Sequence, residues 1–394
     1  MFSKRTNWNL EKNAYARAVE SHRESGRALL DLTISNPTAC GFEYDETTIL
    51  AALRSPVALR YDPQPKGLLS ARQAVVNYYR QQNPSAATDA EHLVLTTGTS
   101  EAYSFLFRLL CESGDEMIVA HPSYPLFDFL ATIEDVTLRP FRLIYDHGWQ
   151  FDFAVLRQAI GPRTRAILLV HPNNPTGHFI SCEEAAQLRD IAEHHHLALV
   201  VDEVFLDYPL PGSEHRKRHG SFVGDSRALT FVLSGLSKTA ALPQMKVAWI
   251  AAHGPDALVR EALARLELIA DTYLSMNAPL QLALPKLLAQ RSAIQSQIIS
   301  RIEANLRELD DQLSRQESIS RLKIEGGWYA VLRVPALESD EELAVRLLEE
   351  YSVLVHPGHF YEFIDDGYVV ISLIPPEEEF AKGAERLIEG IPQK

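Results

Sequence analysis

The chain has 394 residues, of which 46% are hydrophobic and 23% charged, and this composition is typical of a soluble globular enzyme. Its length exceeds that of most single domains, so we expect one large and one smaller domain. The formal net charge of −14 argues against nucleic acid or an anionic membrane as the main partner, because both attract basic surfaces.

The cysteines and the first residues indicate where the protein works. Three cysteines, an odd number without metal-binding or redox spacing, favour a reducing compartment. The opening stretch MFSKRTNWNLEKN lacks the hydrophobic centre of a secretion signal, and no apolar run is long enough to span a bilayer. We therefore expect a cytoplasmic protein. Three consecutive histidines at 194–196 predict no metal site, since neighbouring residues point in different directions around a helix.

The N-terminal segment, residues 1–45, combines a helical pattern near 11–25 with a short strand, DLTIS, at 31–35. From about residue 90 to residue 255, short apolar runs then alternate with helical patterns. Several runs are apolar throughout, as in strands covered on both faces. This alternation predicts an α/β fold with a mostly parallel sheet flanked by helices. Its seven expected strands are 92–97, 116–120, 136–141, 165–170, 197–202, 229–234 and 247–252.

Beyond about residue 256, long helical stretches precede a compact mixed segment with two further strands, 326–334 and 367–374. We expect a large ligand-binding domain over 46–280, built on the seven-stranded sheet, and a small α+β domain over 281–394. The N-terminal segment is expected to pack on the small domain, which is then made from both ends of the chain.

Polar residues follow several of the predicted strands, where doubly wound sheets bind their ligands. Gly98, Thr99 and Ser100 open a helix after the first strand. Backbone N–H groups in such a turn can cradle an anion, although any strand-to-helix turn favours glycine and a hydroxyl. Lys238 follows the sixth strand in the stretch SGLSK, where a lysine is either a solvated surface charge or a nucleophile in a cleft.

Three more residues are expected at the same edge of the sheet. Asp202 ends the fifth strand, where a carboxylate either caps the next segment or keeps a buried cationic nitrogen protonated. Tyr124 offers a ring for stacking or belongs to the core, and Asn174 in NNPTG is also typical of a turn. Together with the lysine and the anion cradle, these residues are the parts needed to hold pyridoxal phosphate.

The ordered set of motifs resembles the class I/II aminotransferases, pyridoxal-phosphate enzymes of fold type I, over essentially the whole chain. The matching stretches are YDPQPKGLLSARQAV, TTGTSEAY, HPSYPLFD, HPNNPTG, VVDEV, SGLSK and EGGWYAVL. The resemblance implies an aminotransferase that moves an amino group between an amino acid and a 2-oxo acid. Lys238 would hold the cofactor as a Schiff base and then move a proton at the substrate Cα.

The resemblance also implies roles for single residues. Asp202 would pair with the nitrogen of the cofactor ring, Asn174 would bind its phenolic oxygen, and Tyr124 would stack on the ring. Tyr61 would reach the cofactor phosphate of a neighbouring subunit, which implies a homodimer with shared active sites. The implied phosphate contacts are Gly98, Thr99, Ser100 and Ser237, and the implied substrate-binding residues are Asn36, Asn174 and Tyr61.

Four positions depart from the pattern of the family. Phe205 stands where a tyrosine commonly binds the ring oxygen, and Gly235 lacks a hydroxyl that is often present. Lys246, which is expected to bind the cofactor, stands where an arginine commonly clamps the phosphate in a planar fork. Val370 stands where the family has the arginine that grips the substrate α-carboxylate.

The missing arginine leaves several hypotheses open. One is an aminotransferase with an altered carboxylate site, and another is a different pyridoxal-phosphate enzyme, such as a β-elimination lyase or a specialised biosynthetic enzyme. A regulatory relative without catalysis is least favoured, because such relatives usually carry a DNA-binding domain. The residues considered as replacements for the arginine are Lys66, Arg333, His356 and His359.

Overall fold

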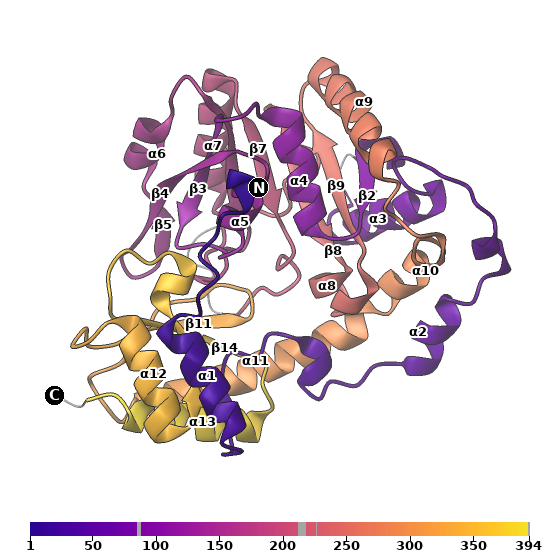
Figure 1. Ribbon diagram of the computed structural model, residues 1–394. Coiled ribbons are helices and arrows are strands. Elements are labelled where there is room, and N and C mark those ends of the chain that lie inside the picture. Colours follow the sequence, from indigo (N-terminus) through magenta and orange to yellow (C-terminus); the bar gives the residue numbers. More distant parts are fainter. Residues whose placement is uncertain (85–87, 212–217, 226, 393–394) are drawn as a thin grey trace.

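The computed structural model describes residues 1–84, 88–211, 218–225 and 227–392, and an eight-stranded sheet forms its centre (Figure 1). The strand order is β2-β9-β8-β7-β6-β3-β4-β5. Neighbouring strands from β8 to β4 are parallel, whereas β9 is antiparallel to β2 and β8, and β5 is antiparallel to β4. The strands are β2 (Leu93–Thr96), β3 (Glu116–His121), β4 (Thr137–Tyr145), β5 (Trp149–Phe151), β6 (Thr164–Val170), β7 (Ala198–Asp202), β8 (Thr230–Gly235) and β9 (Ala248–His253).

The predicted mostly parallel sheet is confirmed, but the number of strands was wrong by one. Each of the seven expected strands is present, and the eighth is β5, which forms a hairpin with an extended β4. A strand of three residues is too short to show an alternation of polar and apolar residues, so the sequence pattern did not reveal it.

Helices cover both faces of the sheet. In β6, Ala166 and Leu168 pack into one core, whereas Ile167 and Leu169 pack into the core on the other face. This double burial explains the continuous apolar runs of the sequence. The helices of this part are α2 (Glu46–Ala52), α3 (Leu69–Gln82), α4 (Thr99–Leu110), α5 (Phe127–Ile133), α6 (Phe153–Ala159), α7 (Cys182–His195), α8 (Leu236–Thr239), α9 (Asp256–Tyr273) and α10 (Ala278–Ala289).

A small α+β unit lies beside the large sheet and combines N-terminal and C-terminal segments of the chain, as predicted (Figure 1). The residues before the first α-helix instead run back to the large part, where the Trp8 ring packs against Phe129 of α5 with centroids 5.7 Å apart (Figure 1). Its antiparallel sheet has the order β10-β11-β14-β13, and β1 pairs in parallel with β12. The N-terminal helix α1 packs on α12. The elements are α1 (Ala14–Glu24), β1 (Leu30–Asp31), α11 (Arg291–Leu313), β10 (Ser320–Arg321), β11 (Tyr329–Arg333), α12 (Asp340–Tyr351), β12 (Val353–Leu354), β13 (His356–Pro357), β14 (Tyr368–Ser372) and α13 (Glu377–Glu389).

Two further features bear on the expectations from sequence. The domain boundaries near residues 45 and 280 stay predictions, although the architecture changes from large-sheet to small-sheet elements between α10 and α11. The three histidines 194–196 are exposed at the end of α7. Among the described residues, the helices that are long enough to cross a membrane are too polar to do so.

Candidate active site

A cavity of about 170 Å³ lies beyond the carboxyl ends of β6, β7 and β8. The large sheet and its loops supply most of the lining, and Ser35 and Tyr329 are added by the elements of the small unit. Lys238 therefore faces an enclosed cleft. The lining residues are Ser35, Thr99, Tyr124, Phe127, Val170, Asn174, Asp202, Val204, Phe205, Ser237, Lys238 and Tyr329.

The Lys238 side chain lies among aromatic rings in α8, the short helix that follows β8. Its Nζ is 5.6 Å from the ring centroid of Phe205 and 4.9 Å from that of Trp328. Burial lowers the pKa of Lys238 to about 8, and attraction to Asp202 opposes this shift. The Tyr208 hydroxyl donates to the Lys238 carbonyl at 2.7 Å and holds the backbone in place. A lysine with a lowered pKa has a larger neutral, nucleophilic fraction near neutral pH.

Asp202 is buried at the end of β7, and donors surround its carboxylate. Its Oδ2 accepts a hydrogen bond from the Tyr103 hydroxyl at 2.7 Å, and its Oδ1 accepts one from the Val204 N–H at 3.0 Å. Burial raises the pKa of Asp202 to about 6, whereas these hydrogen bonds and the nearby Lys238 lower it. The donors favour the ionised carboxylate, which is the form that stabilises a cationic ring nitrogen.

The start of α4 forms a cradle for an anion. Gly98 is the N-cap of this twelve-residue helix and makes no side-chain capping bond. A Cβ atom at Gly98 would lie 3.3 Å from Nζ of Lys246, so the lysine ammonium stands beside the first turn of the helix. Thr99 and Ser237 line the cavity, and Ser100 is exposed in the same first turn of the helix as Thr99. Positive charge, the helix dipole and free N–H groups together favour a phosphate group.

Gly235, one of the departures from the family pattern, has a packing explanation. A Cβ atom at this position would lie 2.8 Å from the Val247 carbonyl oxygen and 2.9 Å from the Ala248 Cβ. A side chain with a hydroxyl therefore has no room here unless β9 moves.

The Asn174 amide lies in the loop after β6 and lines the cavity. Its Oδ1 is buried and has no hydrogen-bond partner in the described part of the chain. A buried polar atom without a partner is costly, so this amide is well suited to a polar atom of a bound ligand. Tyr124, in the loop between β3 and α5, also lines the cavity, and its ring lies edge-on to Phe127 with centroids 5.6 Å apart.

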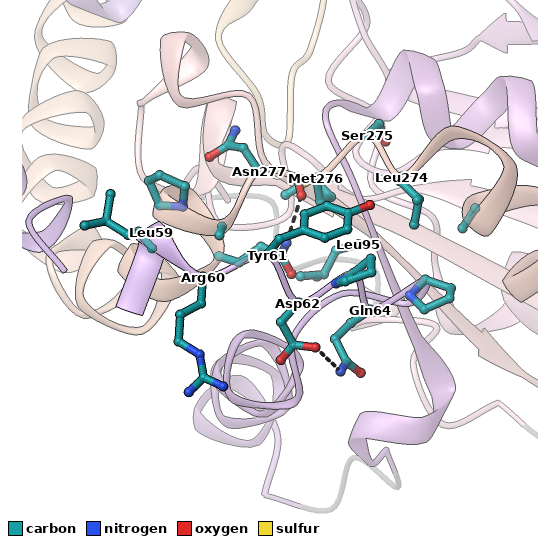
Figure 2. Close-up of a pocket in the computed structure, with 17 residues that line it drawn as sticks. Leu59, Arg60, Tyr61, Asp62, Gln64, Leu95, Leu274, Ser275, Met276 and Asn277 are labelled. Atoms are coloured by element: carbon teal, nitrogen blue, oxygen red, sulfur yellow. Dashed lines mark hydrogen bonds between the residues drawn. The ribbon is translucent and has the colours of Figure 1, made fainter. Parts of the chain in front are cut away.

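Two of the predicted substrate residues do not line this cavity. Asn36 is exposed, and its Oδ1 accepts a hydrogen bond from the Thr38 N–H at 3.1 Å, whereas the preceding Ser35 reaches the cavity. Tyr61 lines a second cavity of about 410 Å³, together with Arg60 and Asn277 among others (Figure 2).

Ser35 and Tyr329 were not predicted as site residues. Tyr329 lies in the matching stretch EGGWYAVL and Ser35 ends the predicted strand DLTIS, but neither residue has a local pattern that distinguishes it from a structural serine or tyrosine.

Three of the four residues considered as a replacement cation are engaged elsewhere. Lys66 forms an ion pair with Glu91 at 2.6 Å. Arg333 lies over the Tyr145 ring and lines another cavity. His359 is exposed and contacts Phe360.

The fourth, His356, lies next to the position where the arginine was expected. Val370 is fully buried in β14, and its backbone partners across the sheet are Val331 in β11 and His356 in β13.

Residues 51–387 match the family described as aminotransferase class I and II. Alanine aminotransferase of Mycobacterium tuberculosis is 29% identical over 371 residues, which cover 92% of this chain and 85% of that protein. Glutamate–pyruvate aminotransferase of Escherichia coli is 28% identical over 342 residues, or 85% of this chain and 83% of that protein. The fold is shared with a solved alanine aminotransferase from Pyrococcus furiosus, with a TM-score of 0.88, 22% identity and 99% of each chain covered.

Proposed function

Because this chain belongs to the class I and II aminotransferases, we propose that it moves an amino group between an amino acid and a 2-oxo acid with pyridoxal phosphate held at Lys238 as a Schiff base. The observation that carries the proposal is the convergence of Lys238, Asp202 and the N-terminus of α4 on one cavity. The similar proteins are named for alanine, glutamate–pyruvate and tyrosine, so they do not single out one substrate.

The residues present suit this cofactor. The first turn of α4 and Lys246 would bind its phosphate, the unpartnered Asn174 amide its ring oxygen, and Asp202 its ring nitrogen. When bound, pyridoxal phosphate supplies an electron sink for the negative charge that develops at the substrate Cα.

The protein's own part in the reaction is to hold groups in place and to move a proton. The Lys238 amine, once released by the amino group of the substrate, can take the proton from the substrate Cα, because its pKa is lowered to about 8. The Asp202 carboxylate would keep the ring nitrogen of the cofactor protonated, and Phe205 and Trp328 surround the lysine with apolar surface that limits water.

The test is to mix the holoenzyme with a panel of amino acids and to record the absorbance of the cofactor. Transfer of the amino group to the cofactor converts the spectrum to that of pyridoxamine phosphate and releases one molecule of 2-oxo acid for each active site. Release of pyruvate and ammonia without that conversion would instead identify a β-elimination lyase, the alternative that the altered substrate site leaves open. A spectrum that no amino acid changes would contradict both functions.

Lys246 should set the affinity for the cofactor phosphate. We expect Lys246→Ala to raise the dissociation constant of pyridoxal phosphate about 10- to 100-fold, because one charge-assisted contact is lost. Lys246→Arg should keep the affinity, since a guanidinium also binds phosphate. Titration of the apoenzyme measures both, with Lys286→Ala, an exposed lysine on α10, as the control. Equal affinities for wild type and Lys246→Ala would contradict the assignment.

We also propose a homodimer in which each subunit completes the other's site. Tyr61 is 84% exposed and cannot be explained as a core residue. Further large apolar side chains are exposed on α2, the segment before α3, the start of α3 and the end of α9. They are Leu50, Val57, Leu59, Leu69, Leu268, Tyr273 and Leu274. A surface of this kind suits association with a second copy.

Shared sites predict complementation between two inactive variants. Tyr61→Ala and Lys238→Ala should each have low activity, whereas co-expression of the two with different affinity tags should restore activity in the purified hybrid. A random dimer mixture then holds about one quarter of the wild-type number of intact sites, because each hybrid has one. Hybrids that form but stay inactive would contradict the shared site.

We also propose that the protein works in a reducing compartment, the cytoplasm, because Cys40, Cys111 and Cys182 form no disulfide.

A further inference from the structure

The side of the active-site cavity that the small unit forms carries no charge. Ser35 and Tyr329 are its contributions to the lining. Among the described residues that line the whole cavity, Lys238 is the only cation and Asp202 the only anion. A substrate group that extends toward the small unit therefore meets hydroxyl groups and apolar atoms, with no guanidinium among them.

Behind Tyr329 lies a chain of hydrogen-bonding side chains. The Tyr329 and Tyr361 rings lie side by side with centroids 6.2 Å apart. The Ser35 and Tyr361 hydroxyls interact with the Tyr329 hydroxyl, and this offsets part of the rise in the pKa of Tyr329 that burial causes. The Tyr361 hydroxyl lies 3.0 Å from Nδ1 of His356. Burial lowers the pKa of His356 to about 4, so its imidazole is neutral near pH 7.

One arrangement of the protons directs the hydrogen bonds of this chain toward the cavity. In it the Nδ1–H of a neutral His356 donates to the Tyr361 oxygen, and the Tyr361 O–H donates to Tyr329. A Tyr329 oxygen that accepts from Tyr361 has its own O–H left to donate. Tyr329 lines the cavity, and the group best suited to it there is an oxygen acceptor on a ligand.

The small sheet holds this chain at a fixed place. Tyr329 lies opposite Ser372, and Val370 lies opposite both Val331 and His356. Residues opposite one another, and residues two apart in a strand, share a face, so Tyr329, Val370 and His356 lie on the same face of the sheet. The Tyr361 carbonyl also accepts a hydrogen bond from the Ser123 N–H at 2.9 Å, which ties the chain to the loop that carries Tyr124.

We propose that Tyr329 binds the oxygen acceptor attached to the Cα of the amino substrate, and that Tyr361 and His356 are positioning residues that orient its hydroxyl. This rests on the function proposed above and extends it to a substrate class. A hydrogen bond from a neutral donor is about twice as strong with a carboxylate as with a carboxamide oxygen, whereas an arginine adds the attraction of a full positive charge and prefers the carboxylate much more strongly. The enzyme therefore accepts α-amino amides as well as α-amino acids.

The test uses two ligands that bind without completing transfer, because they have no hydrogen on Cα: 2-aminoisobutyric acid and its carboxamide. Their dissociation constants are measured on the holoenzyme from the cofactor absorbance. We expect the two constants to agree within about tenfold. A preference for the acid greater than about 100-fold would overturn the proposal, since that is the behaviour of a charged binding group.

Variants identify the residues that bind the two ligands. Tyr329→Phe should weaken both ligands about 10-fold or more while leaving the absorbance and affinity of the cofactor unchanged. His356→Leu should weaken them less, and His356→Asn, which keeps a donor near the place of Nδ1, should recover most of the loss. The matched control is Tyr145→Phe, which removes a hydroxyl outside the cavity that accepts a bond from the Lys323 N–H. Unchanged binding in Tyr329→Phe would overturn the proposal.

Failure of this proposal differs from failure of the proposed function. If Lys238 carries the cofactor and the wild type binds only the acid, the proposal about Tyr329 is wrong and the function stands. If Lys238 carries no cofactor, neither ligand changes the spectrum, and then the proposal about Tyr329 and the proposed function are both wrong.

Discussion

Replacing Lys238 by alanine should abolish the covalent attachment of pyridoxal phosphate and lower turnover by at least roughly 10³-fold. Two contributions are lost together. The amine is the nucleophile that holds the cofactor, and it is the base that moves the proton at the substrate Cα, a task worth about 10²–10⁴-fold on its own. The other cation near the cavity, Lys246, cannot substitute, because its Nζ stands beside Gly98 at the start of α4.

The attachment is measured by borohydride reduction of the holoenzyme, digestion and mass spectrometry of the modified peptide. Wild type and Lys246→Ala should both carry the reduced adduct on Lys238, and Lys238→Ala should carry none. Circular dichroism of the variant checks that the fold is kept. An adduct on another lysine in the wild type would refute the assignment of Lys238.

Replacing Asp202 by asparagine should lower turnover by at least roughly 100-fold and, in the absence of cofactor, make the protein more stable at high pH. The loss of activity follows because an amide cannot hold a ring nitrogen in its protonated form, a carboxylate effect of about one to three pKa units. Both consequences come from one buried carboxylate, whose donors Tyr103 and Val204 are present without any ligand.

The sign of the stability change follows from the pKa of Asp202, which burial raises from 3.8 to about 6. A raised carboxyl pKa means that the folded apoprotein loses stability as the pH rises from about 4 through 6, and the whole penalty is present above that. It amounts to at most roughly 3 kcal/mol, since one pKa unit corresponds to about 1.4 kcal/mol. Asp202→Asn removes the penalty.

Urea unfolding of the apoproteins at pH 4, 6 and 8 measures this effect. The variant should be more stable than wild type at pH 8, and the advantage should shrink toward zero at pH 4. The pKa of Glu203 is raised to about 8 by burial and, in smaller part, by the charge of Asp202. Removing that charge lowers the Glu203 pKa, so this second effect adds to the advantage of the variant at pH 8. A variant that is less stable than wild type at pH 8 would show that the hydrogen bonds of Asp202 outweigh the cost of burying its charge.

The large sheet and most of the cavity could be predicted from the sequence because both depend on local patterns. A strand buried on two faces must be apolar throughout, so the seven runs were recognisable one by one, and only the three-residue β5 escaped. Parallel strands end at one edge of the sheet, so Asn174, Asp202 and Lys238, each located after a recognisable run, had to meet there.

The substrate side of the cavity was decided only by the tertiary structure. Lys66 and Arg333 were reasonable candidates by residue type. However, Lys66 forms an ion pair with Glu91 and Arg333 lies over the Tyr145 ring, and both partners are distant in sequence. Ser35, Tyr329 and the pair His356 and Tyr361 come from three separate segments of the small unit, and no spacing along the chain relates the three segments. A hydrogen-bond chain between side chains exists only once packing sets their distances and excludes water, and packing depends on the whole fold.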